Sequence, residues 1–200
     1  MIKIGGIKMK YLAAVNFKNI IFVLITLLWW GEFIIFNPPP DEGQKGKKTF
    51  YQILIAILSS IGMAFLLSYL SIGNFDANLI MYTRTIALII YTSGLIIRYW
   101  SLIFLGKHFT RGISVQAEQE LVKAGLYKHL RHPLYLGLFL LTIGAVSFVG
   151  NGLAILFAII VMFAALRSRI LSEEKYMIET LGGRYQHWKH DKDKFLPFIY

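Results

Sequence analysis

The sequence predicts an all-α, polytopic membrane protein with about five transmembrane helices, of which the last two form a short helical hairpin. Hydrophobic residues make up 56% of the 200 positions, a composition too apolar for an ordinary soluble domain and a chain too long for a single anchor. The apolar residues fall into long runs separated by polar segments that contain most of the lysines and arginines. The chain has no cysteine, which excludes disulfides, thiolate metal sites and a thiol nucleophile.

Three apolar runs predict the first three spans, at residues 20–36, 50–72 and 79–105. The basic residues before the first run are similar to the start of a signal peptide, but the run that follows is too long and lacks a cleavage site of small residues. We therefore interpret it as a retained span.

Three charged residues lie inside these runs. Glu32 precedes the break at Asn37-Pro38 by about one turn, and we interpret it as a carboxylate at the membrane interface. Arg84 and Arg98 lie near the two ends of the third run, where their long side chains are expected to snorkel toward water.

The predicted hairpin consists of residues 134–149 and 153–166, joined by the turn sequence Gly150-Asn151-Gly152. Both halves are short for crossing a bilayer independently and are expected to tilt or to thin the membrane. Pro133 predicts that an irregular loop ends at His132 and that a helix begins directly after it. We divide the chain into an N-terminal membrane region with three spans, residues 1–105, and a catalytic region, residues 106–200.

The formal charge of +10 is distributed unevenly over the loops. With five spans, 15 lysines and arginines lie in the loops 37–49 and 106–133 and in the tail from residue 167, against 4 before the first span. The positive-inside rule places the first group in the cytoplasm. No nucleic-acid motif accompanies the basic residues, so anionic membrane lipids are the expected partners and nucleic acid is not.

Two polar clusters flank the hairpin, one at residues 125–137 and one at residues 169–174. Taken alone, Arg131 and His132 are equally well explained as interfacial anchors. Arg169 and Glu173 are four residues apart and share a helix face, where such a pair contributes only a few tenths of a kcal/mol. Neither cluster by itself establishes a function.

In combination the clusters contain the motifs Leu121-Val122-x-x-Gly125-x-Tyr127, Arg131-His132-Pro133-x-Tyr135-x-Gly137, Arg169-x-x-x-Glu173-Glu174, Gly182-x-x-Tyr185 and Leu196-Pro197-Phe198. In this order they resemble the isoprenylcysteine carboxyl methyltransferase family, over about 80 residues in the C-terminal two fifths of the chain. The second motif alone is also similar to one in membrane sterol reductases and phospholipid methyltransferases.

The resemblance implies an integral-membrane methyltransferase that uses S-adenosyl-L-methionine and acts on a lipophilic, carboxylate-bearing acceptor. It implies a cytoplasmic cofactor site formed by the loop before the hairpin and the helix after it, with no metal. The implied cofactor-binding residues are Gln119, Glu120, Leu121, Val122, Tyr127, His132, Pro133, Leu134, Tyr135, Glu173 and Glu174. Arg169 and Glu173 are the implied catalytic residues, and Arg169 the implied acceptor-binding residue.

The chain departs from the family pattern at two positions. Gln119 stands where many members have histidine, and Trp188 stands where they have tyrosine. Glutamine still donates a hydrogen bond, so these changes put the identity of the acceptor in doubt more than the cofactor.

Three alternatives remain at this point. A phospholipid amine N-methyltransferase would use the same cofactor. A sterol-reductase-like NADPH enzyme is expected to need more spans and a longer tail. A membrane scaffold or transporter is disfavoured because the polar groups gather beyond the spans and not within them.

Overall fold

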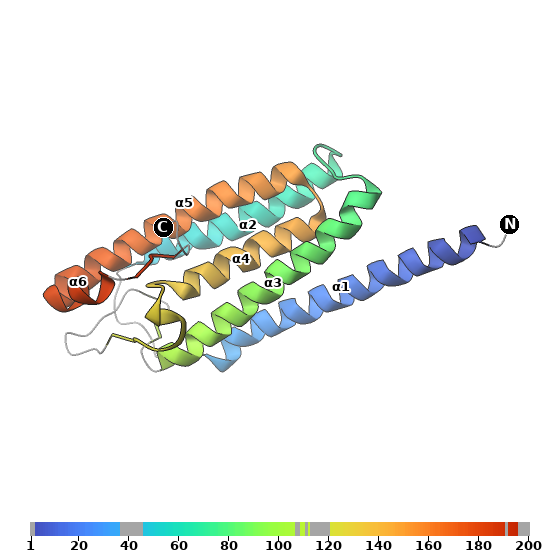
Figure 1. Cartoon of the computed structure of the whole chain (residues 1–200). Helices are drawn as coiled ribbons and strands as arrows, with labels where there is room; N and C mark the ends of the chain where they lie inside the picture. The colour runs from blue at the N-terminus through green and yellow to red at the C-terminus, as the bar shows by residue number, and fades with distance from the viewer. Residues whose placement is uncertain are drawn as a thin grey trace.

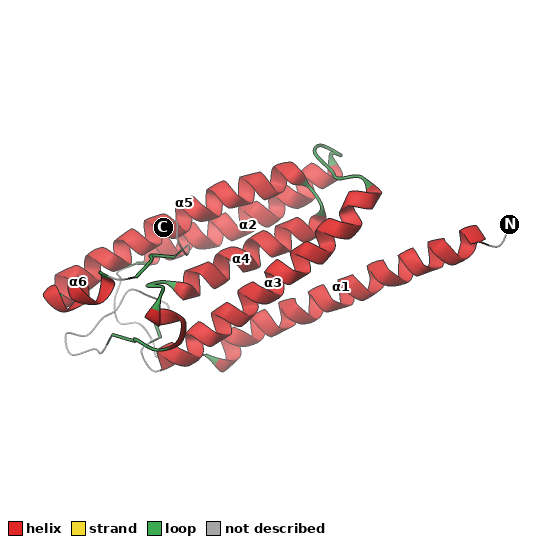
Figure 2. Cartoon of the chain, viewed as in Figure 1, coloured by secondary structure: helices red, strands yellow, loops and turns green. Residues whose placement is uncertain are grey.

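The computed structural model describes residues 3–36, 46–106, 109–110, 112, 121–190 and 192–195, with side chains in the first helix described from Phe17 onward. Helices and loops account for these residues (Figure 2). The helices are α1 (Lys3–Ile35), α2 (Lys47–Tyr69), α3 (Ala77–Leu105), the 3₁₀ helix η2 (Gly125–Lys128), α4 (Pro133–Val149), α5 (Gly152–Leu181) and α6 (Gly183–Lys189). Gln119, Glu120 and the motif Leu196-Pro197-Phe198 lie outside the described residues.

Four of the described helices are long and apolar enough to cross a membrane: α1 from Phe17 to Ile35, α2, α3 and α5. The helix α4 is apolar but shorter, with 17 residues. The all-α, polytopic membrane fold predicted from the sequence is therefore confirmed.

The second helix of the hairpin is longer than predicted. We expected it to end at Leu166, but α5 continues without interruption for 30 residues to Leu181. Neither glycine nor proline occurs between Gly152 and Gly182 to stop it. Buried residues continue at helical spacing past the apolar run, at Leu166, Ile170 and Glu174. As a result, the second polar cluster is carried by a rigid extension of the hairpin.

The helix α4 lies at the centre of the bundle and packs against α2, α3 and α5, while α1 lies along α3 (Figure 1). The contact between α3 and α4 is the most extensive because glycines allow the two backbones to approach closely. A Cβ atom at Gly144 would lie 2.7 Å from the backbone nitrogen of Tyr91, and one at Gly137 would lie 2.9 Å from that of Arg98. These contacts fix the start of α4 relative to the end of α3.

A network of hydrogen bonds joins the two turns at one end of the bundle. The Asn151 side-chain nitrogen donates to the Ile72 carbonyl at 2.7 Å and to Asn74 Oδ1 at 2.8 Å. Its oxygen accepts from the backbone nitrogen of Ala154 at 3.0 Å and so caps α5. We call residues 72–76 and 149–152 the turn end of the molecule.

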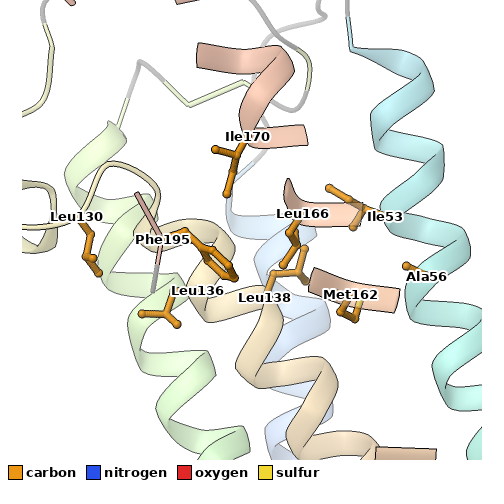
Figure 3. Packing of buried hydrophobic residues seen from close by; sticks show 9 residues of the cluster. All are labelled: Ile53, Ala56, Leu130, Leu136, Leu138, Met162, Leu166, Ile170 and Phe195. Carbon is orange, nitrogen blue, oxygen red and sulfur yellow. The ribbon is translucent and has the colours of Figure 1, made fainter. Parts of the chain in front are cut away.

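At the opposite end, the C-terminal segment is tied to the loop before α4. The backbone nitrogens of Arg131 and His132 each donate over 2.9 Å, to the carbonyls of Asp193 and Lys194. Phe195 follows directly and is fully buried in an apolar cluster with residues of α2, α4 and α5 (Figure 3). This end, which also contains the C-terminal end of α3 and of α5, holds both polar clusters, and we call it the site end.

Candidate active site

The loop before α4 has the shape predicted from its proline. Pro133 lies in the first turn of α4, and His132 before it has non-helical backbone angles, with φ of −129° and ψ of 56°. Gly125, at the start of η2, has a positive φ of 58°, and a Cβ atom there would lie 2.5 Å from the ring of Phe104. Both features direct the loop back over the end of α3.

Tyr135 links α4 to the polar face of α5. Its hydroxyl donates to Glu173 Oε2 at 2.6 Å and accepts from Arg169 Nε at 3.0 Å. Arg169 and Glu173, which the sequence placed on one face of a helix, are therefore linked through Tyr135 of the first polar cluster.

Arg169 also joins α2 to the site. Its Nη1 donates to the Gly46 carbonyl at 2.9 Å and to Thr49 Oγ1 at 3.1 Å, both at the start of α2. The side chain is only 4% exposed. Because a planar guanidinium bonds in fixed directions, these contacts hold its positive charge in one place beside Tyr135 and Glu173.

A second group of contacts surrounds Glu174. Arg131 Nη1 lies 2.9 Å from Glu174 Oε1, and His132 Nε2 lies 3.5 Å from the same oxygen. The His132 ring stacks on Tyr135 with ring centroids 5.7 Å apart. His132 and Glu174 are both buried, so the two contact groups form one continuous polar layer between α4 and α5.

Two buried polar atoms in this layer lack a partner with good hydrogen-bond geometry among the residues that the structure describes. They are His132 Nε2, which lies 3.5 Å from Glu174 Oε1, and Tyr185 Oη, which also lies near Glu174. Leaving such a group unpaired costs about 1 to 3 kcal/mol. Burial, followed by the negative charges of Glu174 and Glu173, raises the pKa of Tyr185 well above its usual value. Its hydroxyl is therefore a neutral donor at physiological pH.

Tyr127 approaches the same layer from η2. Burial raises the pKa of its hydroxyl far above the usual value, and the nearby charge of Glu173 raises it further. Ser101, near the end of α3, hydrogen-bonds this hydroxyl. Tyr127 is therefore a neutral phenol held by α3.

The structure brings six of the predicted residues together: Tyr127, His132, Tyr135, Arg169, Glu173 and Glu174. Pro133 is buried at the start of α4, and Leu134 is partly buried beside it. Leu121 and Val122 are partly buried, and the Val122 carbonyl accepts a hydrogen bond from Trp188 Nε1 at 3.2 Å. Trp188 thereby ties α6 to the loop that precedes η2.

The interpretation of Glu32 as an interfacial carboxylate is wrong. Glu32 is 2% exposed, and both its oxygens bind Arg98, one of them Nη2 at 2.6 Å and the other Nε. Arg98 accordingly lies in the protein interior and does not extend to water. The sequence did contain an indication of this pair, since one acidic and one basic residue each lie inside an apolar run. Charged residues are tolerated in such runs when they pair with each other.

The contacts of four further residues were not predicted from the sequence: Arg131, Thr49, Ser101 and Phe195. Arg131 was considered as a possible anchor and as part of a motif, but its pairing with Glu174 was not predicted. Thr49, Ser101 and Phe195 carry no local signal, because their contacts join segments far apart in the chain.

A sequence model of the isoprenylcysteine carboxyl methyltransferase family matches residues 86–179. The match includes the motif residues from Leu121 to Glu174 and extends back into α3, beyond the part in which the motifs were found. The resemblance predicted from the sequence is confirmed.

Among curated proteins, the chain is similar to protein-S-isoprenylcysteine O-methyltransferases of two yeasts. It is 27% identical to that of Saccharomyces cerevisiae over 97% of this chain and 86% of the relative. It is 26% identical to that of Schizosaccharomyces pombe over 86% of this chain and 73% of the relative.

The fold is similar to a solved structure of the eukaryotic intramembrane Ras methyltransferase ICMT, with a TM-score of 0.62 and 22% sequence identity. The superposition covers 95% of this chain and 66% of the solved chain, so the chain spans about two thirds of that protein. In sequence, the chain is therefore similar to members of the isoprenylcysteine carboxyl methyltransferase family over residues 86–179, and its fold is similar to that of the solved methyltransferase.

Proposed function

We propose that this protein is an integral-membrane O-methyltransferase of the isoprenylcysteine carboxyl methyltransferase type. The methyl donor is S-adenosyl-L-methionine, and the acceptor is a lipophilic molecule that ends in a carboxylate. The observation that carries the proposal is the convergence of His132, Tyr135, Arg169 and Glu173 at one end of the bundle. The family match to residues 86–179 and the names of the relatives support it.

The residues of the site end fit the proposed methyl donor. An amino-acid and nucleoside cofactor requires a carboxylate for its ammonium, donors for its carboxylate and ribose, and aromatic rings for its adenine or sulfonium. Glu173 is suited to the first role, and the unpartnered atoms His132 Nε2 and Tyr185 Oη to the second. Tyr127 and Tyr135 are suited to the third.

The bound cofactor would supply a methyl group on a sulfonium, which a carboxylate attacks directly in a single displacement. A carboxylate is ionised at neutral pH, so the reaction needs no strong general base. What the protein contributes is the alignment of donor and acceptor and the exclusion of water. A rigid layer of side chains between α4 and α5 is well suited to that task.

Arg169 is proposed to bind the acceptor. Its positive charge would attract a carboxylate to the polar layer beside Tyr135 and Glu173. The hydrogen bonds to Tyr135, Gly46 and Thr49 would keep the charge from moving. A lipid amine would gain nothing from this arrangement, which favours carboxylate over amine acceptors.

The site end is proposed to face the cytoplasm, since the loops and tail on that side contain 15 lysines and arginines. A water-soluble cofactor would enter from this side and a lipophilic acceptor from the bilayer. The basic loops would also favour anionic lipid headgroups near the site.

The direct test is methyl transfer by the purified protein in nanodiscs, with S-adenosylmethionine labelled in its methyl group. We expect label in a base-labile ester when the acceptor is a farnesylated cysteine with a free carboxylate. The methyl-esterified form of the same acceptor is the matched control and should take up no label. Transfer to phosphatidylethanolamine instead would favour the phospholipid alternative, and absence of transfer to either acceptor would contradict the proposal.

A further inference from the structure

The pair formed by Glu32 and Arg98 lies outside the polar layer described above. The two side chains come from α1 and α3 and are 2% and 9% exposed as residues. Nη2 of Arg98 lies 2.6 Å from Glu32 Oε1, and Nε binds the other oxygen. Two parallel hydrogen bonds of this kind fix the plane of the guanidinium.

The third nitrogen of Arg98 points to the start of α4. Nη1 donates to the carbonyl of Leu134 at 3.4 Å, in the first turn after His132 and Pro133. The backbone of Arg98 also lies against Gly137, where a Cβ atom would lie 2.9 Å from the Arg98 nitrogen. Arg98 is thus in contact with the helix turn that carries Tyr135.

The same part of α3 also reaches η2. The charge of Arg98 acts on the Tyr127 hydroxyl and opposes part of the rise in pKa that burial causes. Ser101, three residues after Arg98, hydrogen-bonds that hydroxyl. Residues 98–101 therefore connect α1 to two segments that contribute to the site.

Anchoring α1 does not by itself require this pair. Four other hydrogen bonds join α1 to α3 among the described residues. Thr26 pairs with Tyr91 at 3.0 Å, and Tyr99 donates to the Leu28 carbonyl at 2.6 Å. Lys18 Nζ donates to the Met81 carbonyl at 2.8 Å and to Thr85 Oγ1 at 2.7 Å. A buried ion pair loses much of its attraction to the cost of removing both charges from water, and apolar replacements are often neutral or stabilising. A charged pair inside the membrane region is therefore better explained by a functional role than by stability.

We infer that Glu32 and Arg98 are positioning residues for methyl transfer. Glu32 fixes the guanidinium of Arg98, and Arg98 holds the first turn of α4 so that His132 and Tyr135 face α5 correctly. This makes α1, which precedes the family match at residues 86–179, a functional part of the site. The inference rests on the proposed function for its kinetic readout, but not for its structural one.

The test compares Glu32→Gln, Arg98→Met and the apolar double variant Glu32→Leu with Arg98→Met, all in nanodiscs. Tyr99→Phe is the matched control, because it removes a neighbouring hydrogen bond between α1 and α3 without touching α4. Three quantities are measured for each: the melting temperature, hydrogen exchange of the amides of residues 131–137, and kcat and KM for methyl transfer.

We expect each single variant to lower the melting temperature, because each leaves a buried charge unpaired or an acceptor unsatisfied. The double variant should recover the melting temperature. It should still exchange the amides of Tyr135 and Leu136 faster, by about tenfold, because these amides bond to the His132 carbonyl in the turn that Arg98 holds. Its kcat should fall by about 10 to 100 fold with KM for the acceptor changed far less, which is the signature of misaligned reactants.

Recovery of wild-type exchange and turnover in the double variant would overturn the inference and leave the pair a purely structural contact. An equal fall in kcat and an equal rise in amide exchange in Tyr99→Phe would also overturn it, by showing that any weakening of the contact between α1 and α3 has this effect. If wild-type protein transfers no methyl group, the proposed function fails, whereas the exchange of residues 131–137 still decides the role of the pair.

Discussion

The two ends of the helical bundle use buried polar side chains in opposite ways. At the turn end, Asn151 donates to two acceptors and accepts from the first turn of α5, so its hydrogen-bonding groups are used within the protein. At the site end, His132 Nε2 and Tyr185 Oη are buried without a partner among the described residues. Leaving a buried polar group unpaired costs free energy. Residues whose polar groups are all bonded within the protein therefore stabilise the fold, whereas residues that keep an unpaired buried atom are suited to bind a ligand.

The largest effect is expected at the site end, from Arg169→Gln. Turnover of a carboxylate acceptor should fall by roughly 2 to 5 kcal/mol in transition-state stabilisation, because a buried fixed charge is lost. Binding of S-adenosylhomocysteine should fall much less. The measurement is kcat/KM beside calorimetric binding, with Arg169→Lys expected to restore only part of the rate because a point charge cannot form two parallel hydrogen bonds.

Arg167→Gln is the control for this prediction, since Arg167 is exposed on the same helix two residues earlier. Equal losses of cofactor binding and turnover in Arg169→Gln would show that the arginine only supports Glu173. An undiminished rate on an amine lipid would argue against a carboxylate acceptor.

At the turn end, Asn151→Ala should reduce stability without changing catalysis. Three hydrogen bonds are lost, one of which caps α5, and we expect a free energy of unfolding that is lower by roughly 2 to 3 kcal/mol. The kcat per folded molecule should stay at the wild-type value. Asn78, exposed near the same turn, provides the control Asn78→Ala. A change in kcat that exceeds the change in folded protein would remove the distinction between the two ends.

Substituting His132 should affect ligand binding more than stability, the reverse of what we expect for Asn151. His132→Ala is expected to weaken binding of S-adenosylhomocysteine by roughly 1 to 3 kcal/mol, because a buried donor to the cofactor is removed. The melting temperature without ligand should change less than in Asn151→Ala, because the substitution removes the ring contact with Tyr135 but no well-formed hydrogen bond of Nε2 among the described residues. His129→Ala, in the exposed part of the same loop, should bind normally. Normal binding by folded His132→Ala would return this residue to the role of an interfacial anchor.

The smallest expected effect comes from Tyr185→Phe. Removing an unpartnered buried hydroxyl should leave the stability of the free protein unchanged or raise it by up to about 1 kcal/mol. Cofactor binding should weaken by about the same amount. Thermal unfolding with and without S-adenosylhomocysteine measures both, with Tyr82→Phe on the exposed surface of α3 as the control. A clear loss of stability without ligand would show that the hydroxyl is bonded within the protein.

Much of the fold could be predicted because each span is a local property of the sequence. Hydrophobic runs and the glycine turn at residues 150–152 located the helices, and Pro133 located the start of α4. The end of α5 was misplaced because hydrophobicity stops at the membrane surface whereas helical structure does not. The continuation to Leu181 depends on helix-forming polar residues that bury one face against the rest of the protein.

The site could be predicted only where residues already suggested chemistry in their own segment. Arg169 and Glu173 were placed on one helix face, but their link through Tyr135 depends on how α4 packs against α5. Glu32 was misread because its partner lies 66 residues away in another helix. Gln119 and Glu120 stay predictions, as does the division of the chain at residue 106.

The central claim is that the polar layer between α4 and α5 is a methyl-donor site, and calorimetry tests it most directly. Purified protein in nanodiscs is titrated with S-adenosylhomocysteine and, separately, with NADPH, beside the variants His132→Ala and Glu173→Ala. We predict binding of S-adenosylhomocysteine in the micromolar range, clear weakening in both folded variants, and no heat from NADPH. Binding of NADPH in place of S-adenosylhomocysteine, or S-adenosylhomocysteine binding that neither substitution weakens, would contradict the claim.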